Sequence, residues 1–425
     1  MSDQDKQMQT AAELRGPIGD YARAWKSSDF NAMLKVVIDV IDVVRVVLPH
    51  PLRPEENTRC RSSLRSGMYN LLFFSSETND SKWILCQQTS FADAIITTAG
   101  LIGITKVGSG QKIKEYNEKF LAGDYENQFI HNDEYGGLVL GQSKPFHFFY
   151  DQFINLPKLL AGRRHLTNYV ARGAGMFLLP DGCLGIDSAE KKKQTYYFFP
   201  NVYGANERKK GDTASYYEDA NHMEQAIASA YPRRTPESAY DLVLWIGITG
   251  QKRAWIEQVE GYAAIIHRLA DQFPAMHVYV DGITAGDGKT SENLDDAAVV
   301  DQLTEKVGSR VILQSVVGLD YPRKIALCHS VDVFISNGGT GAFVPLRICK
   351  KPGVMHSNQT VWTFNYDSYP DTIACIKGDP VPVILENSKR HDYVSYSIDW
   401  REVYNRLVPI VNDVKNMRIA PVFIP

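Results

Sequence analysis

The sequence contains little of what marks a secreted or membrane-spanning protein. Its six cysteines are scattered through 425 residues without a C-x-x-C pair, which argues against a disulfide scaffold and a structural zinc site. The polar N-terminal segment, residues 1–17, has no apolar signal core. The most apolar stretch, residues 31–51, is interrupted by Asp39, Asp42 and Arg45, whose three-residue spacing predicts one polar face of a half-buried helix. We therefore expect a cytoplasmic chain.

An excess of charge of one sign is also missing. The formal net charge is −3, with 22% charged and 44% hydrophobic residues, which is ordinary for a soluble globular protein. Without a basic excess, we expect no nucleic-acid partner. A chain of this length exceeds what one average core serves, so two domains are expected.

Three familiar ligand-binding motifs are absent. No strand is followed by G-x-G-x-x-G with an acidic residue about 20 positions further on, which disfavours a dinucleotide-dependent oxidoreductase. No glycine turn continues into Gly-Lys-Ser/Thr, so there is no P-loop. The Asp-x-Asp triplet that metal-dependent sugar transferases use occurs only as Asp3-Gln4-Asp5, in the polar tail. We therefore expect neither a metal nor a cofactor.

The second half alternates apolar runs with amphipathic segments about five times. Residues 240–250 (YDLVLWIGITG) form an apolar run ending in Gly, which predicts a buried strand, and the segment after it repeats apolar residues at helical spacing. Strands without polar alternation are typical of a sheet covered on both faces. The short connections predict a parallel, doubly wound α/β domain over residues 236–395.

The first half is less regular. Several short apolar runs predict strands, and a helix is expected to begin at Pro145. We interpret residues 1–235 as a second α/β domain. Residues 396–425 contain a last helix, which could cross back to the first domain. The runs interpreted as strands are residues 67–77, 81–88, 136–142, 175–180 and 195–204.

Ligands of open α/β sheets bind at the carboxyl ends of the strands, and three loops of the second half leave such ends. Lys252 and Arg253 could neutralise a diphosphate, or they could be solvated charges on a first helical turn. Asp281 could bind a sugar hydroxyl or serve as a turn residue. The turn Gly338-Gly339-Thr340-Gly341 lies between an apolar run and a predicted helix, where glycines admit a phosphate or simply shape the turn.

This last stretch, S-N-G-G-T-G-A followed by C-K-K-P-G-V, resembles the C-terminal half of GT-B-fold glycosyltransferases. In that family the turn receives the diphosphate of a nucleotide sugar. Thr340-Gly341 is similar to the Asp-Thr-Gly turn of heptosyltransferase-like enzymes. Gly339 stands where that pattern has Asp and Val344 where it usually has His, which argues against a close heptosyltransferase assignment.

The resemblance implies two Rossmann-like doubly wound domains facing across a cleft. It implies metal-independent transfer of a sugar from a nucleotide sugar to a glycan or glycolipid acceptor. By resemblance, the setting is bacterial lipopolysaccharide or capsule polysaccharide biosynthesis, with peripheral contact to the inner face of the membrane. A sugar-nucleotide epimerase of the same fold and a catalytically inactive GT-B-like binding protein are the alternatives.

A general base is expected in the first half. His147 and Asp151 are four residues apart on the predicted helix and so share one face. Imidazole titrates near neutral pH, and a carboxylate can orient it; a buried His satisfied by a backbone carbonyl is the alternative. Asp133 and Glu134 are rival carboxylates. His329 and His356 lie near the predicted crevice, and His356 could contact the donor.

Overall fold

The computed structural model describes residues 11–166, 169–173, 176–233, 239–250, 253–358, 371–381 and 394–425. The chain divides into two compact units, Met1–Ala226 and Ile227–Pro425. The sequence places the boundary nine residues later, at 235/236. Each unit has its own sheets and its own buried side chains.

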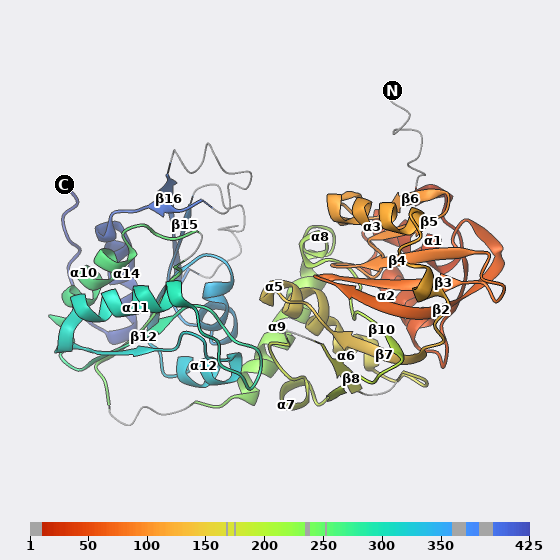
Figure 1. Cartoon of the computed structure of the whole chain (residues 1–425). Coiled ribbons are helices and arrows are strands. Elements are labelled where there is room, and N and C mark those ends of the chain that lie inside the picture. The colour runs from red at the N-terminus through yellow and green to blue at the C-terminus, as the bar shows by residue number, and fades with distance from the viewer. Residues whose placement is uncertain are drawn as a thin grey trace. The chain divides into compact units, whose positions relative to one another are not determined.

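Unit 1 begins with helices and an antiparallel meander, the red-to-orange elements of Figure 1. Its strands pair in sequence order, β1-β2-β3-β4-β5-β6, and the apolar side chains of β3, β4 and β5 form a core with α3 and α4. The elements are η2 (Ala11–Glu13), α1 (Gly16–Lys26), α2 (Phe30–Ile41), β1 (Val47–His50), β2 (Arg53–Ser66), β3 (Tyr69–Ser75), β4 (Lys82–Gln87), β5 (Ala94–Thr97), β6 (Gly100–Gly103), η3 (Val107–Ser109), α3 (Gln111–Leu121) and α4 (Glu126–Phe129).

A smaller parallel sheet completes unit 1, with strand order β10-β7-β8-β9. The helix expected from Pro145 is present, but it changes type along its length from α to π, 3₁₀ and α again. The elements are β7 (Glu134–Leu140), α5 (Pro145–His147), η4 (Phe148–Gln152), η5 (Phe153–Asn155), α6 (Leu156–Leu160), β8 (Tyr169–Arg172), α7 (Asp181–Leu184), β9 (Asp187–Glu190), β10 (Thr195–Phe198), α8 (Ala205–Gly211) and α9 (Thr213–Ala230), which runs across the unit boundary.

The doubly wound arrangement expected for residues 1–235 is not found in the meander. Short connections explain the difference, because parallel neighbours need crossovers of roughly a dozen residues or more. Only Gly67 and Met68 separate β2 from β3, and Gly67 takes a positive φ of 61° that suits a tight hairpin. Strand β2 was not predicted at all, because its sequence, RPEENTRCRSSLRS, is largely polar and partly exposed.

The helix face that was predicted to carry Asp39, Asp42 and Arg45 does not form as expected. Helix α2 ends at Ile41, so Asp42 is its C-cap residue and Arg45 lies beyond the helix. The Asp42 carboxylate accepts hydrogen bonds from the backbone N–H groups of residues 164–166 at 2.8–3.2 Å. These bonds lower the pKa of Asp42 against the opposing effect of its burial.

Unit 2 is built on one seven-stranded sheet of order β13-β12-β11-β14-β15-β16-β17. All neighbours are parallel except β17, which runs antiparallel to β16. The elements are β11 (Leu242–Gly247), α10 (Gln258–Ala270), β12 (Met276–Asp281), α11 (Leu294–Val307), η6 (Gly308–Arg310), β13 (Ile312–Ser315), α12 (Tyr321–Cys328), β14 (Val333–Asn337), η7 (Thr340–Ala342), η8 (Phe343–Ile348), β15 (Gly353–Asn358), β16 (Ile373–Pro380), β17 (Tyr396–Ser397) and α14 (Trp400–Lys415).

The first six strands of this sheet have the 3-2-1-4-5-6 order of the Rossmann fold. Every residue of β11 and β12 is buried, as expected for strands covered on both faces. Asn293 caps α11, since its Oδ1 accepts from the N–H of Asp296 at 3.0 Å. Gly308 ends that helix with a φ of 65°.

The last helix belongs to the core of unit 2. Its apolar face, which includes Val403, Leu407 and Val411, is buried with side chains of β11, β12, β14 and α10. Asp399 caps its first turn by accepting from the N–H of Arg401 at 2.9 Å. The apolar face of α14 is therefore used within unit 2.

Candidate functional site

The topological switch point of the unit 2 sheet lies between β11 and β14. From β11 the chain proceeds to β12 on one side, and from β14 it proceeds to β15 on the other. The two strands are paired in parallel up to Gly247 and Ser336, so their carboxyl ends are adjacent. In open α/β sheets this is the position where ligands bind.

The glycine turn predicted from the sequence follows β14 at this point. Gly339 is exposed and has a φ of 113°, a conformation that other residues rarely adopt. A Cβ on Gly341 would stand 2.4 Å from Asn337 Oδ1, so this position also excludes a side chain. Gly338 is buried and donates its N–H to the carbonyl of His356 at 2.7 Å. Gly339 is therefore the open member of the turn.

Arg253 comes to the same place from the end of β11. Its Nη1 lies 3.7 Å from the position that a Cβ on Gly339 would occupy. The structure thus brings together a guanidinium and an exposed glycine that are 86 positions apart (339 − 253 = 86). Lys252, the other predicted cation, lies outside the described residues, as does the side chain of Thr340.

The backbone of Arg253 is fixed by a distant part of the chain. Arg253 has a positive φ of 58°, which costs about 1–3 kcal/mol for a residue with a side chain and requires support from its surroundings. The support comes from residues 394–398. Ala254 accepts from the N–H of Tyr396 at 3.0 Å, Ile256 donates to its carbonyl at 2.9 Å, and Trp255 Nε1 donates to Ile398 at 3.0 Å.

The helix predicted after the turn does not have the expected form. Residues Thr340–Ala342 make a 3₁₀ turn and Phe343–Ile348 a π turn, so no regular α-helix begins here. Pro345, which lacks a backbone N–H, disfavours a regular helix at this place. The predicted phosphate site therefore has no regular helix N-terminus at this turn.

Asp281 does not face a ligand. It is buried at the end of β12, where its Oδ1 accepts from Lys324 Nζ at 2.5 Å. Lys324 is also buried and donates to the carbonyl of Ile283 at 2.9 Å and to Thr284 Oγ1 at 2.8 Å. Burial raises the pKa of Asp281, and the Lys324 charge opposes that rise. The predicted sugar contact is replaced by a buried ion pair that secures the loop after β12.

His356 is also a core residue. Tyr262 donates its hydroxyl to the Gly247 carbonyl at 2.8 Å, so the same oxygen accepts from His356 Nε2–H at 3.0 Å. Nδ1 then accepts from the Tyr396 hydroxyl at 2.7 Å. Burial lowers the pKa of His356 to about 3, so the ring is neutral at physiological pH. Both ring nitrogens are occupied, and the predicted donor contact is wrong.

Asp296 was missed by the sequence interpretation, although it organises the two loops beside Arg253. One of its carboxylate oxygens accepts from the Gly250 N–H and the other from the Ile283 N–H, both at 2.8 Å. It is 4% exposed. Gly250 fits because a Cβ there would stand 2.4 Å from the backbone of Asp295. The side chain resembles an ordinary first-turn acid in the sequence, so no local pattern identifies it.

In unit 1 the predicted His147–Asp151 pair is formed. His147 Nδ1 lies 2.5 Å from Asp151 Oδ2. The histidine side chain is 21% exposed and the aspartate 1%. Among the residues that the structure describes, His147 Nε2 has no hydrogen-bond partner. A buried carboxylate that holds Nδ1–H leaves Nε2 as the basic nitrogen, which is the arrangement of an oriented general base.

Asp151 is held in turn by the loop after β10. Its Oδ1 accepts from the N–H of Ala205 at 2.8 Å, at the start of α8. Its pKa is raised by burial, and the hydrogen bonds from His147 and Ala205 limit that rise. Glu207 lies on the same helix, and its pKa is raised by burial and by the charge of Asp151. Perturbed carboxyl groups clustered with a histidine are characteristic of functional sites.

The rival groups named from the sequence have other surroundings. Glu134 begins β7, at the strand end opposite the one that leads to His147, and Asp133 pairs with His131 at 3.6 Å. His329 Nε2 is 3.2 Å from the carbonyl of Ala228, in α9. Neither Asp133 nor Glu134 is joined to the His147–Asp151 pair by a described contact.

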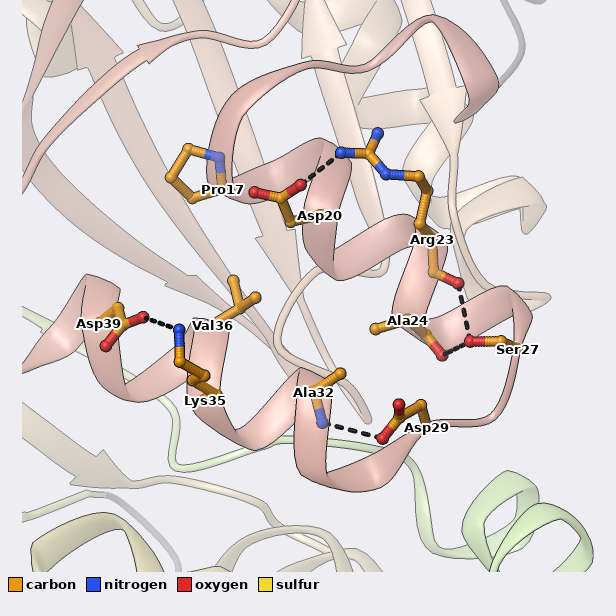
Figure 2. Close-up of a pocket in the computed structure, with 10 residues that line it drawn as sticks. All are labelled: Pro17, Asp20, Arg23, Ala24, Ser27, Asp29, Ala32, Lys35, Val36 and Asp39. Atoms are coloured by element: carbon orange, nitrogen blue, oxygen red, sulfur yellow. Dashed lines mark hydrogen bonds and ion pairs between the residues drawn. The ribbon is translucent and has the colours of Figure 1, made fainter.

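A surface groove between α1 and α2 is shown in Figure 2. Its charged side chains are paired along their own helices, Asp20 with Arg23 and Lys35 with Asp39. Asp29 caps α2 by accepting from the N–H of Ala32 at 2.9 Å. The charges of this groove therefore have structural partners, and it contains no predicted site residue.

The described residues offer neither a metal centre nor a membrane span. No cluster of three or more His, Cys, Asp or Glu side chains is placed to hold a metal ion in these parts of the chain. Likewise, no helix within the described ranges has the length and apolar character needed to cross a bilayer.

Comparisons with known proteins identify no family for this chain. No protein-family model matches the chain, and no curated protein matches it. Among solved structures, the chain is similar to a mutant of S. aureus TarM in complex with Fondaparinux, alpha-GlcNAc-glycerol and UDP. The identity is 8%, the match covers 93% of this chain and 80% of that chain, and the TM-score is 0.21. That score is too low to carry an argument about fold or activity.

Proposed function

We propose that the protein is a glycosyltransferase in which unit 2 binds a nucleotide-sugar donor and unit 1 activates the acceptor hydroxyl. The observation that supports this most is the meeting of Arg253 with the exposed Gly339 at the switch point of a 3-2-1-4-5-6 sheet. A guanidinium can form two hydrogen bonds to phosphate oxygens, and a glycine without a Cβ lets a diphosphate approach the backbone.

The proposed reaction divides between the two groups. His147 Nε2 takes the proton of an acceptor hydroxyl, while Asp151 stabilises the imidazolium that forms. The hydroxyl oxygen bonds to the anomeric carbon, and the bond from that carbon to the diphosphate oxygen breaks. The nucleoside diphosphate leaves with the electron pair, and Arg253 neutralises part of its charge. A glycan or glycolipid acceptor and a role in lipopolysaccharide or capsule assembly remain expectations from the sequence resemblance.

Nucleotide binding tests the donor half of the proposal. We expect UDP, GDP, CMP or ADP to raise the melting temperature, because a ligand that binds only the folded state stabilises it. Arg253→Ala should weaken that binding by about tenfold or more, given about 1.5–3 kcal/mol for a hydrogen bond to a charged group. Arg310→Ala is the matched control, since Arg310 forms an exposed pair with Asp271 before β13. Stabilisation by NAD alone, or equal affinity in both variants, would refute the proposal.

A further inference from the structure

The side chain of Asn337 lies at the end of β14, directly before the glycine turn. Of the five residues of this strand, the first four are buried and Asn337 is partly exposed. Strand β14 pairs with β11 on one side and with β15 on the other. The amide of Asn337 therefore stands at the switch point of the sheet, beside the proposed anion site.

The two polar atoms of this amide have different surroundings. Asn337 Oδ1 is buried, and none of the described residues donates a hydrogen bond to it. Asn337 Nδ2 is not buried, and no described residue accepts a hydrogen bond from it. The amide therefore turns its oxygen inward and presents its NH₂ to solvent. An amide NH₂ has two N–H donors and no acceptor, so the accessible side of this residue offers donors alone.

Gly341 leaves the space that the Asn337 oxygen occupies. A Cβ on Gly341 would stand 2.4 Å from Asn337 Oδ1 and 3.5 Å from its Cγ. The backbone of Gly341 does not adopt a positive φ, so its conformation does not require glycine. The room needed by the amide of Asn337 therefore explains the glycine at this position, and the glycine in turn permits the orientation of that amide.

Asn337 and Arg253 contact the same tight turn. The Ala342 N–H donates to the carbonyl of Gly339 at 3.3 Å, which closes residues 339–342 into one turn. The Asn337 amide packs on this turn at Gly341, and Arg253 Nη1 lies 3.7 Å from the Cβ position of Gly339. Gly339 is exposed, so an anion can reach the turn from solvent.

We infer that Asn337 is a further binding residue of this site, whose NH₂ donates a hydrogen bond to a phosphate oxygen held by Arg253 beside Gly339. A diphosphate has several charged oxygens, so one ligand can accept from the guanidinium and from the amide together. The inference rests on the proposed function for the identity of the anion as part of a nucleotide sugar. Binding of the anion itself can be measured separately with inorganic pyrophosphate.

Two substitutions of Asn337 distinguish contact with an anion from support of the turn. Asn337→Ala removes the amide, and Asn337→Asp keeps its shape but replaces the donor with a charged oxygen. A residue that only supports the turn is replaced better by Asp than by Ala, whereas a residue that touches an anion is replaced worse by Asp. Asn416→Asp is the matched control, because it makes the same change at an exposed position after α14.

The measurement is isothermal titration calorimetry of the full chain with pyrophosphate, UDP, GDP and ADP. We expect pyrophosphate to bind equally to the wild type and to Asn416→Asp. Binding to Asn337→Ala should be about tenfold weaker, as expected for the loss of one hydrogen bond to a charged group. Binding to Asn337→Asp should be weaker still. Wild-type affinity in both Asn337 variants, or tighter binding to Asn337→Asp than to Asn337→Ala, would overturn the inference.

Gly341→Ala provides a second test through the same amide. Its methyl group would displace the Asn337 amide, so it should weaken pyrophosphate binding about as much as Asn337→Ala does. In the Asn337→Ala background the displaced group is gone, and the nearest remaining side-chain atom is Ser336 Oγ at 3.4 Å. Adding Gly341→Ala there should therefore cause no further loss, whereas additive losses would contradict the assigned role of Asn337.

The probes separate this inference from the proposed function. Pyrophosphate binding that depends on Asn337, without binding of any nucleotide, would support the inference and refute the donor half of the proposed function. Nucleotide binding that is lost in Arg253→Ala but unchanged in both Asn337 variants would refute the inference alone. If the wild type binds neither pyrophosphate nor a nucleotide, both are wrong.

Discussion

Removal of the Asp296 carboxylate should loosen the two loops beside Arg253. In the native protein this side chain accepts from the Gly250 and Ile283 N–H groups, both at 2.8 Å, and is almost fully buried. A hydrogen bond to a charged group contributes about 1.5–3 kcal/mol. Two such bonds would give about 3–6 kcal/mol, and we expect about 3 for Asp296→Ala, because both loops can take up water once released.

Two further variants distinguish the loss of these two hydrogen bonds from other effects of a substitution in the first turn of α11. Asp296→Asn keeps an oxygen for one N–H but presents NH₂ to the other, so it should cost about half as much as Asp296→Ala. Asp295→Ala removes an equal charge from an exposed neighbour and should cost under about 1 kcal/mol, since only the helix dipole is affected.

The assay has a global and a local readout. Urea unfolding followed by tryptophan fluorescence includes the signal of Trp245 and Trp255, both buried in unit 2, together with that of Trp25 and Trp83 in unit 1. Hydrogen exchange of peptides that contain Gly250 and Ile283 reports the two N–H groups directly. If Asp296→Ala unfolds within about 1 kcal/mol of the wild type and both amides stay protected, the assigned role of this carboxylate is wrong.

Three other predictions concern buried charges. Lys324→Met should destabilise unit 2 by about 3–5 kcal/mol in urea unfolding, because it leaves Asp281 buried and unpaired; recovery in Lys324→Met with Asp281→Leu would support this, and no recovery would contradict it. Burial raises the pKa of Asp93 to about 6, so the native state binds more protons than the unfolded state between pH 3.8 and 6. The raised pKa makes the free energy of unfolding about 3 kcal/mol more favourable to the folded state below this window than above it. About 2 kcal/mol of this stabilisation should be lost between about pH 4.5 and 7.5, measured as the difference in unfolding free energy between the wild type and Asp93→Asn. A difference that does not change with pH would refute this prediction. Asp151→Asn should lower kcat about 10²-fold or more with nucleotide affinity unchanged, whereas weaker nucleotide binding alone would make the His147–Asp151 pair structural.

The sheet of unit 2 could be predicted because its information is local. Each strand is an apolar run, each helix has its own stripe, and caps such as Asn293 are read within a few residues. The His147–Asp151 pair was predicted for the same reason, since the two residues are one helical turn apart. The meander of unit 1 was not predicted, because β2 is polar and half-exposed.

The outcomes at Asp281 and His356 depended on partners that a single sequence does not identify. Asp281 is neutralised by Lys324, 43 positions later, and His356 is enclosed by Tyr262 and Tyr396, 94 and 40 positions away. A polar residue at a strand end has the same local pattern whether it faces a ligand or a buried partner. Asp296 was missed because its interactions also join separate loops.

The support that residues 394–398 give to Arg253 has a consequence for the order in which the protein is made. Ala254 and Ser395, which are hydrogen-bonded, are 141 positions apart. A ribosome adds about 5–20 residues per second, so Arg253 leaves the ribosome roughly 7–30 seconds before the segment that holds its backbone. Strands β11 to β16 can pair during this interval, but the backbone at Arg253 cannot take its final form until residues 394–398 have been made. A nascent chain would therefore form most of this sheet before it could hold Arg253 beside Gly339.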